Sequence, residues 1–208
     1  MLRRTWISAL ALTAAVFAAP ALRAEPVAGD AFVKQLSNEV IDTVKADKAI
    51  QNGDVSRIRT LVDAKVMPHV NFQRMTSMAV GPQWRSATPE QQKRMLEEFK
   101  TLMINTYSGA LTQVKDQTVL VKPMRAASAE GDIVVRTEVR GKGEPIQLDY
   151  RLEKVGEGWK IYDVNVGGFW LVEAYKGQFA KDLSAGGLDA LITRLAEKNK
   201  ATNAAPKS

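Results

Sequence analysis

The sequence has no cysteine and one histidine among its 208 residues. Without cysteine there is neither a disulfide framework nor thiolate chemistry, so core packing must hold the fold together. His69 alone cannot build a zinc site of His and Cys ligands. It follows a helix-ending proline with no nucleophile nearby, so we expect a structural or surface role for it. The H-E-x-x-H and G-x-S-x-G signatures are also absent, and the sequence therefore predicts a protein that is not an enzyme and has no metal site or cofactor.

Two further patterns that suggest chemistry have simpler interpretations. The stretches "GKGEPI" and "GEGWKI" begin like phosphate-binding loops, but each lies between predicted strands and opens no helix, so we predict turns. Asp149 and Asp163 are a conceivable carboxylate pair. Asp149, however, alternates onto the polar side of its strand, and we predict that it faces solvent.

Charge of one sign is not concentrated anywhere in the chain. Lys and Arg total 29 against 23 Asp and Glu, and the two signs are interleaved, as in "RLEKVGEGWK". Interleaved charge is typical of a solvated surface and does not favour a strip that binds nucleic acid.

Long apolar runs are missing except at the N-terminus. Residues 1–24 have the pattern of a cleaved secretory signal, with Arg3 and Arg4 before "WISALALTAAVFAAPA". The run is short for a membrane anchor and ends in small residues and a proline, which favours cleavage over retention. We predict cleavage after Ala24, with Ala21 as the alternative. Removal of three arginines lowers the formal net charge from +6 to +3.

The exported remainder is long enough for one domain with a sizeable core. No internal repeat or long linker interrupts residues 25–199, so we predict a single domain there. Residues 200–208 lack apolar spacing and are predicted to be a disordered tail.

Helical periodicity dominates the first half of this domain. The spacing predicts helices from Asp30 to about Ala46, from near Asp54 to Pro68 and from Asn71 to Gly81. Asp30 and Asn71 are predicted to cap the first and third of these helices. A fourth helix from Thr88 to about Lys115 opens with the capping box "TPEQ".

After Gln117 the apolar period changes from 3.6 to 2, which predicts strands. Four segments follow this pattern, and short glycine turns join them into an antiparallel meander: "QTVLVKPMR", "DIVVRTEVRG", "PIQLDYRLEKV" and "WKIYDVNV". Two helices close the domain, one from about Phe169 to Leu183 and one carrying Leu188 to Leu195. The order predicts an α+β fold in which one face of a sheet of about four strands meets a helical layer.

The apolar content is unusually deformable. The mature chain keeps six methionines and several aromatic residues, and methionine fills irregular spaces and adapts to flexible ligands. Residue types alone leave two interpretations open, an ordinary core or a ligand cavity.

A resemblance bears on this choice. The segments "AVGPQWRSATPEQ", "DYRLEKVGEGWKIYDV" and "GLDALITRL" occur in the order found in the MlaC family of periplasmic phospholipid-binding proteins, also called the toluene-tolerance family. The resemblance runs from about Phe32 to Asn199. It departs from the family at Phe169 and Trp170, which replace smaller residues.

The resemblance implies a fold like nuclear transport factor 2, with a deep apolar pocket for acyl chains. It also implies a periplasmic location and a role as monomeric carrier of phospholipid between outer and inner membranes, which maintains outer-membrane asymmetry. The implied partners are an outer-membrane lipoprotein–porin complex and an inner-membrane ABC transporter with an MCE-domain subunit. An interaction module of the cell envelope that binds no lipid is the alternative.

The residues expected to contact acyl chains are those whose position in the helical or strand period faces inward and that lie near the segments of the resemblance. They come from two helices, two strands and the segment after the last strand: Met75, Met78, Phe99, Leu102, Met103, Tyr107, Leu148, Tyr150, Leu152, Val166, Phe169, Leu171, Val172 and Tyr175.

Overall fold

The computed structural model describes residues 28–123 and 131–204. The predicted signal peptide and both predicted cleavage positions lie outside this part of the chain. Helices come first, an antiparallel sheet follows, and a long helix ends the described chain. The predicted α+β class is confirmed.

The first helix, α1 (Gly29–Ala46), has the predicted extent but not the predicted cap. Ala28 occupies the cap position and makes no side-chain cap bond. Asp30 lies within the first turn, where its Oδ1 accepts from the Ala31 amide. The predicted capping role of Asp30 is therefore wrong, although a carboxylate in the first turn still suits the helix dipole.

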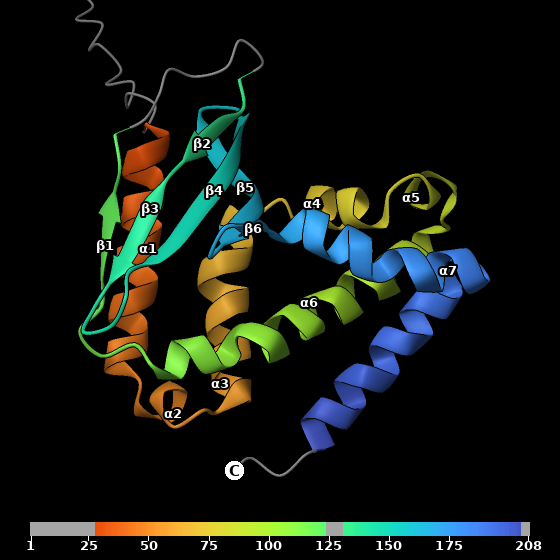
Figure 1. Ribbon diagram of the computed structural model, residues 1–208, viewed down its shortest axis with the longest axis horizontal. Helices are drawn as coiled ribbons and strands as arrows, with labels where there is room; N and C mark the ends of the chain where they lie inside the picture. Colours follow the sequence, from red (N-terminus) through yellow and green to blue (C-terminus); the bar gives the residue numbers. More distant parts are fainter. Residues whose placement is uncertain (1–27, 124–130, 205–208) are drawn as a thin grey trace, which may run out of the picture.

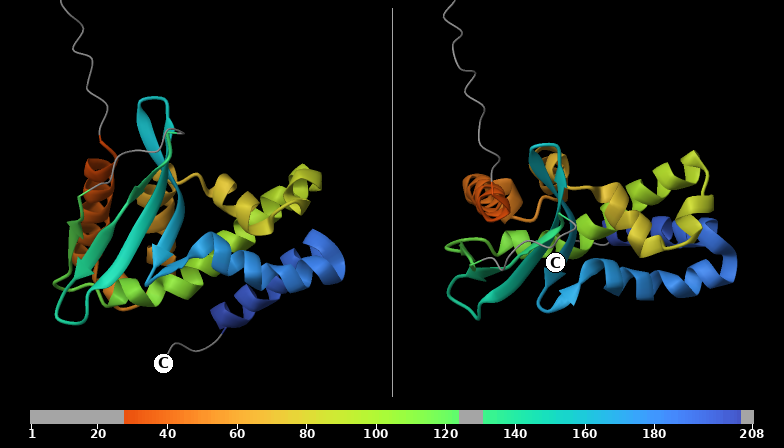
Figure 2. Two further views of the ribbon diagram at one scale, coloured as in Figure 1. Left: turned by 45° about the horizontal axis from the view of Figure 1, so that its top comes forward. Right: turned by 90° about the horizontal axis from the view of Figure 1, so that it is seen from above.

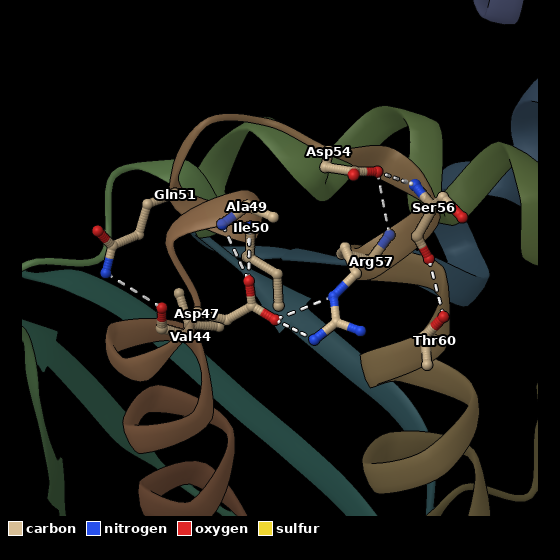
Figure 3. Close-up of polar contacts among 9 residues, drawn as sticks. All are labelled: Val44, Asp47, Ala49, Ile50, Gln51, Asp54, Ser56, Arg57 and Thr60. Carbon is tan, nitrogen blue, oxygen red and sulfur yellow. Dashed lines mark hydrogen bonds and ion pairs between the residues drawn. The ribbon is translucent and has the colours of Figure 1, made fainter.

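Two short helices follow, and aspartates fix their starts. Asp47 caps α2 (Lys48–Gln51), an unpredicted turn. Asp54 caps α3 (Val55–Leu61), which starts where predicted. Figure 3 shows that Asp47 also receives the guanidinium of Arg57, with Nη2 at 2.6 Å and Nε at 3.1 Å from Oδ2. One carboxylate thus links α2 to α3.

The helix that begins at Asp54 loosens before it ends. A π-helical turn, η1 (Val62–Val66), and a 3-10 turn, η2 (Met67–His69), follow α3. Pro68 has no amide hydrogen for the helical ladder. The helical turns end at His69, close to the predicted end at Pro68, but the regular α-helix ends seven residues before Pro68, at Leu61.

The next helices carry the predicted start signals. The side chain of Asn71 caps α4 (Phe72–Val80), and Gly81 at φ 77° ends it. After the short α5 (Gln83–Ser86), both bonds of the Thr88–Gln91 capping box open α6 (Pro89–Thr112). This helix ends three residues before the predicted Lys115.

Among the described residues the sheet has six strands where four were predicted: β1 (Thr118–Val121), β2 (Ile133–Val135), β3 (Thr137–Arg140), β4 (Ile146–Val155), β5 (Gly158–Val166) and β6 (Phe169–Trp170). The order is β1-β3-β4-β5-β6, all antiparallel, and β2 also pairs with β4. The second predicted strand is divided because the Thr137 amide donates to the Asp149 side chain at 3.2 Å instead of to the ladder.

The segment after β5 differs most from the prediction. Phe169 and Trp170 form β6, paired with Val166 and Asn165, and the helix α7 (Leu171–Ala204) starts only after them. Gly167 and Gly168 make this hairpin possible because both adopt positive φ, at 59° and 98°. The prediction of a helix from Phe169 is therefore wrong by two residues.

The two predicted C-terminal helices are halves of α7, separated by a kink at Gly186 and Gly187. Gly187 has φ 68°, which favours glycine, and a Cβ on Gly186 would stand 2.8 Å from the Ala190 Cβ. Figure 1 shows the second half turning back beside α6. The helix runs to Ala204, five residues past the predicted end of the domain.

Three groups of buried apolar residues hold these elements together. The helical cluster is formed by α4, α5, α6 and α7 (Figure 1). The sheet cluster lies between α1 and the strands, and the N-terminal cluster is formed by α1, α2, α3 and α6. Figure 2 shows α1 beside the sheet at one end of the molecule and the kink of α7 at the other end. The helical cluster contains Met75, Ala79, Val80, Trp84, Met95, Phe99, Leu102, Leu171, Val172, Tyr175, Phe179, Leu188, Leu191, Ile192 and Leu195. The sheet cluster contains Val33, Leu36, Ile133, Val135, Leu152 and Ile161; the N-terminal cluster contains Val44, Ile50, Ile58, Leu61 and Ile104.

Candidate functional site

The helical cluster brings together most residues predicted to contact acyl chains. Members of α4, α6, β5 and α7 belong to it or pack against it: Met75, Met78, Phe99, Leu102, Met103, Tyr107, Val166, Leu171, Val172 and Tyr175. At its centre the Phe99 ring meets Tyr175 at 4.9 Å and Phe179 at 5.3 Å between ring centroids, both edge to face. Helical spacing thus identified a real apolar group before its partners were known.

The remaining predicted residues lie elsewhere. Leu152 is fully buried in the sheet cluster, and Tyr150 packs against that cluster from β4. Leu148 is half-buried beside Val166, its partner across the strands. Phe169 is 74% exposed. Strand phase placed Tyr150 and Leu152 on the inner face correctly, but it could not tell that α1 covers this part of the sheet.

One face of α6 changes from buried to open along its length. Met95 and Phe99 are fully buried and Leu102 nearly so, whereas Thr106 and Ala110, at the same helical spacing, are exposed. The N-terminal half of this face is covered by α4 and α7. The C-terminal half therefore presents small, mostly apolar surface next to the helical cluster.

Accessible surface also remains where the clusters meet. Val40 packs against both the sheet and N-terminal clusters, and Val70 and Val164 pack against both the helical and sheet clusters. All three are only partly buried. A domain of this size usually has one contiguous core, whose central residues are the most buried. Here the residues at the joins are less buried than those within each cluster.

Tyr150 has the same combination of depth and accessibility. Burial raises the pKa of its hydroxyl to about 12, and the side chain of Ser37 on α1 interacts with it. The hydroxyl is therefore deep within the fold, yet the residue keeps accessible surface. Tyr150 therefore lies inside the fold without being completely covered by protein atoms.

Sequence reasoning missed Val40, Val70, Val164 and Thr106 as members of this region. Val164 could have been found, because it is two residues before Val166 and shares its strand phase. Val70 lies in a short connection without periodicity, where residue spacing carries no information about packing.

The two carboxylates Asp149 on β4 and Asp163 on β5 are buried, whereas Asp149 was predicted to face solvent. Asp149 is 4% exposed and accepts from the Thr137 amide and, at 2.6 Å, from Gln147 Nε2. Asp163 is fully buried. Position on the polar side of a strand did not mean exposure, because neighbouring groups satisfy these carboxylates.

Asp163 connects three elements. Its Oδ1 accepts from the amides of Val164 at 2.9 Å and Val172 at 3.1 Å, and its Oδ2 pairs with Arg151 Nη1 at 2.9 Å. The Val172 amide belongs to the first turn of α7, so a strand carboxylate caps this helix. Burial raises the pKa of Asp163, while the Val172 amide and Arg151 oppose the rise.

Two arginines stack on aromatic rings beside this carboxylate. The Arg151 guanidinium carbon lies 3.9 Å from the centre of the Trp170 ring, which explains why Trp170 is half-buried while Phe169 is exposed. The corresponding distance from Arg74 to Tyr162 is 3.7 Å, and Arg74 also pairs with Asp132 and Glu153. The guanidinium groups of Arg151 and Arg74 therefore both have carboxylate and aromatic partners within the protein.

A small polar spot lies at the open end of the helical cluster. Tyr175 is 4% exposed, and its hydroxyl interacts with the side chains of Tyr107 and Thr106. Burial, followed by Tyr107, raises the pKa of Tyr175 to about 12, so this hydroxyl stays neutral at physiological pH.

Within residues 28–123 and 131–204, no group of three or more His, Asp or Glu side chains is arranged to hold a metal ion. No helix in the same part of the chain is long and apolar enough to cross a membrane.

Comparisons with known proteins agree on one family. The model of the family described as "MlaC protein" matches residues 34–197. The intermembrane phospholipid transport system binding protein MlaC of Haemophilus influenzae is 24% identical over 78% of each chain. The toluene tolerance protein ttg2D of Pseudomonas putida is 27% identical over 76% of this chain and 74% of its own.

A solved structure agrees as well. The phospholipid-binding protein of Ralstonia solanacearum, determined in complex with a phospholipid, is 44% identical and superposes with a TM-score of 0.82. The match covers 85% of this chain and 99% of that protein. Since the family model spans most of the chain and its architecture recurs in this relative, the protein belongs to the MlaC family.

Proposed function

We propose that this protein carries phospholipid through the periplasm between the outer and inner membranes. The observation that carries the proposal is accessible surface at depth, on Tyr150 and at the joins of the three clusters. Apolar surface there suits acyl chains. Family membership and the phospholipid in the Ralstonia relative support the same ligand.

The energetics explain why such a carrier needs an enclosed site. Two acyl chains have roughly 30 methylenes, each costing about 0.8 kcal/mol to expose to water, so bare transit would cost on the order of 20 kcal/mol. That sum is near the ceiling of non-covalent affinity. The transfer must therefore be nearly isoenergetic between membrane and protein, which adaptable methionine and aromatic side chains favour.

The proposed chain of events begins with export and signal cleavage near residue 24. The mature protein then exchanges lipid with two membrane partners. These are an outer-membrane lipoprotein–porin complex and an inner-membrane ABC transporter with an MCE-domain subunit, as the family resemblance implies. Binding and transfer require no covalent step, so the proposal is not of an enzyme.

Native mass spectrometry of the purified mature protein tests the ligand. We expect co-purified phospholipid at about one molecule per chain, released by organic extraction and identified by its fragment ions. A folded, lipid-free preparation that also fails to take up labelled phospholipid from vesicles would contradict the proposal.

A further inference from the structure

The polar spot formed by Thr106, Tyr107 and Tyr175 lies where the covered face of α6 becomes open. Leu102, one turn earlier, is buried in the helical cluster, whereas Thr106 is exposed and Tyr107 is half-buried. Tyr175 comes to the same place from α7. Three hydroxyl groups therefore meet at the boundary between apolar interior and open surface.

The hydroxyl hydrogens at this spot can be assigned by counting. The Thr106 hydroxyl donates to the Leu102 carbonyl at 2.8 Å, so towards its neighbours Thr106 can only accept. The Tyr175 hydroxyl can donate to Thr106 or to Tyr107, since it interacts with both side chains. When it donates to Tyr107, the Tyr107 oxygen is the acceptor of that bond and the Tyr107 hydrogen is available to an acceptor outside this group.

A phospholipid in the proposed site has acceptors that match this donor. Its acyl chains are apolar, and the first polar groups above them are ester carbonyls, which accept but do not donate. A neutral hydroxyl at the boundary of an apolar site is the partner that such a carbonyl needs, because burying it unpaired is costly.

We infer that the Tyr107 hydroxyl donates a hydrogen bond to an acyl-ester carbonyl of the bound phospholipid, with Tyr175 and Thr106 positioning it. This inference rests on the proposed function. Helix α6 would then contact the ester groups of the lipid, in addition to the apolar contacts with its acyl chains.

Ether lipids separate this contact from chain burial. A diether phosphatidylcholine has the same chains and head group as its diester counterpart but no ester carbonyls. We expect the wild-type protein to bind the diester about tenfold more tightly, the effect of one hydrogen bond to a buried acceptor. Tyr107→Phe should bind both lipids with the affinity that wild type shows for the diether.

Tyr162→Phe is the matched control, because it also removes one hydroxyl from a buried tyrosine and Tyr162 is not among the residues of the proposed lipid site. That hydroxyl interacts with the side chain of Asp132, so the preference for the diester should remain. Thermal unfolding followed by circular dichroism checks that each variant is folded; Tyr107 is half-buried, so little stability should be lost.

Competition against a fluorescent phospholipid gives the affinities. A wild-type protein without preference for the diester, or a Tyr107→Phe variant that keeps the preference, would overturn the inference and leave the proposed carrier function standing. A wild-type protein that binds neither lipid would overturn both.

Discussion

The helical cluster and the sheet cluster are built from different residue types. The sheet cluster is mainly β-branched and leucine side chains between α1 and the strands, with Val135 and Leu152 fully buried. The helical cluster contains methionine and large aromatic side chains, and one end of it opens along α6. β-Branched residues are stiff at χ1, whereas methionine adapts. The comparison assigns a stiff wall to the sheet and an adaptable wall to the helices.

The largest effect on stability is expected at Asp163, which connects the strands of the stiff wall to α7 of the adaptable wall. Asp163→Ala would leave Arg151 without its carboxylate and the first turn of α7 without its cap. Removing one partner of a buried ion pair costs about 3–5 kcal/mol. Urea unfolding would measure the loss. Asp163→Asn keeps an acceptor for the Val172 amide and should cost less; an equal loss in both variants would show that the cap contributes nothing.

The stiff wall is tested by Leu152→Ala. This side chain is fully buried, so we expect a loss of about 2–5 kcal/mol in the free energy of unfolding. Because it has no accessible surface, the amount of phospholipid per folded chain should not change. A folded variant with less bound lipid would place Leu152 at the site and break the distinction between the walls.

Alkaline titration compares Tyr150 in one wall with Tyr175 in the other. The folded-state pKa of each is about 12, above the ordinary 10, so each contributes stability that is complete below pH 10 and is lost as pH rises through 12. At about 1.4 kcal/mol per pKa unit, each hydroxyl accounts for roughly 2–3 kcal/mol of this loss.

Tyrosinate absorbance between pH 9 and 12 would follow the ionisation of the tyrosines. Urea unfolding over the same range would follow the loss of stability. Tyr150→Phe and Tyr175→Phe should each flatten the decline in stability. A decline as steep as that of wild type in both variants would contradict the assignment.

The adaptable wall is tested by Met103→Ala. Met103 is half-buried and packs against the helical cluster, so truncation should cost about 1–2 kcal/mol of stability. We expect phospholipid affinity to fall several-fold, equivalent to about 1 kcal/mol, measured by competition with a labelled lipid. Unchanged affinity would show that Met103 only fills the core.

The smallest effect on stability is expected at Phe169, which is 74% exposed. Phe169→Ser should change the free energy of unfolding by less than about 0.5 kcal/mol. Phe169 stands in a row with Val166 and Leu148, its neighbours across the strands, and this row leads to the helical cluster. We therefore expect slower uptake of labelled phospholipid from vesicles.

Trp170→Ser is the matched control for Phe169→Ser. It removes the ring on which Arg151 stacks and should cost about 1–2 kcal/mol of stability. Uptake by Phe169→Ser at the wild-type rate would exclude the row as a path for lipid.

Local signals in the sequence predicted many features of the fold. The Asn71 cap, the Thr88–Gln91 capping box and the Gly81 stop act within a few residues, so they can be recognised without knowing the tertiary partners. The alternation in β2, β3 and β4 likewise identified the inner face of the sheet. The ordered family motifs identified the family, which the comparisons confirm.

The candidate site was predictable only in part. Periodicity gathered Met75, Phe99 and Tyr175 correctly because each lies on an apolar helical stripe. Periodicity did not distinguish Leu152, which α1 covers, from Val166, which packs against the helical cluster.

Sequence by itself determined where α3, α4 and α6 start, which faces are apolar and which family the chain belongs to, because caps, periods and motifs are local. Tertiary structure decided which apolar faces meet and which charges are buried. Asp163 is buried because the Val172 amide and Arg151 satisfy it, and Phe169 is exposed because two glycines turn it back along β5. These outcomes depend on partners brought together by folding, which no local pattern contains.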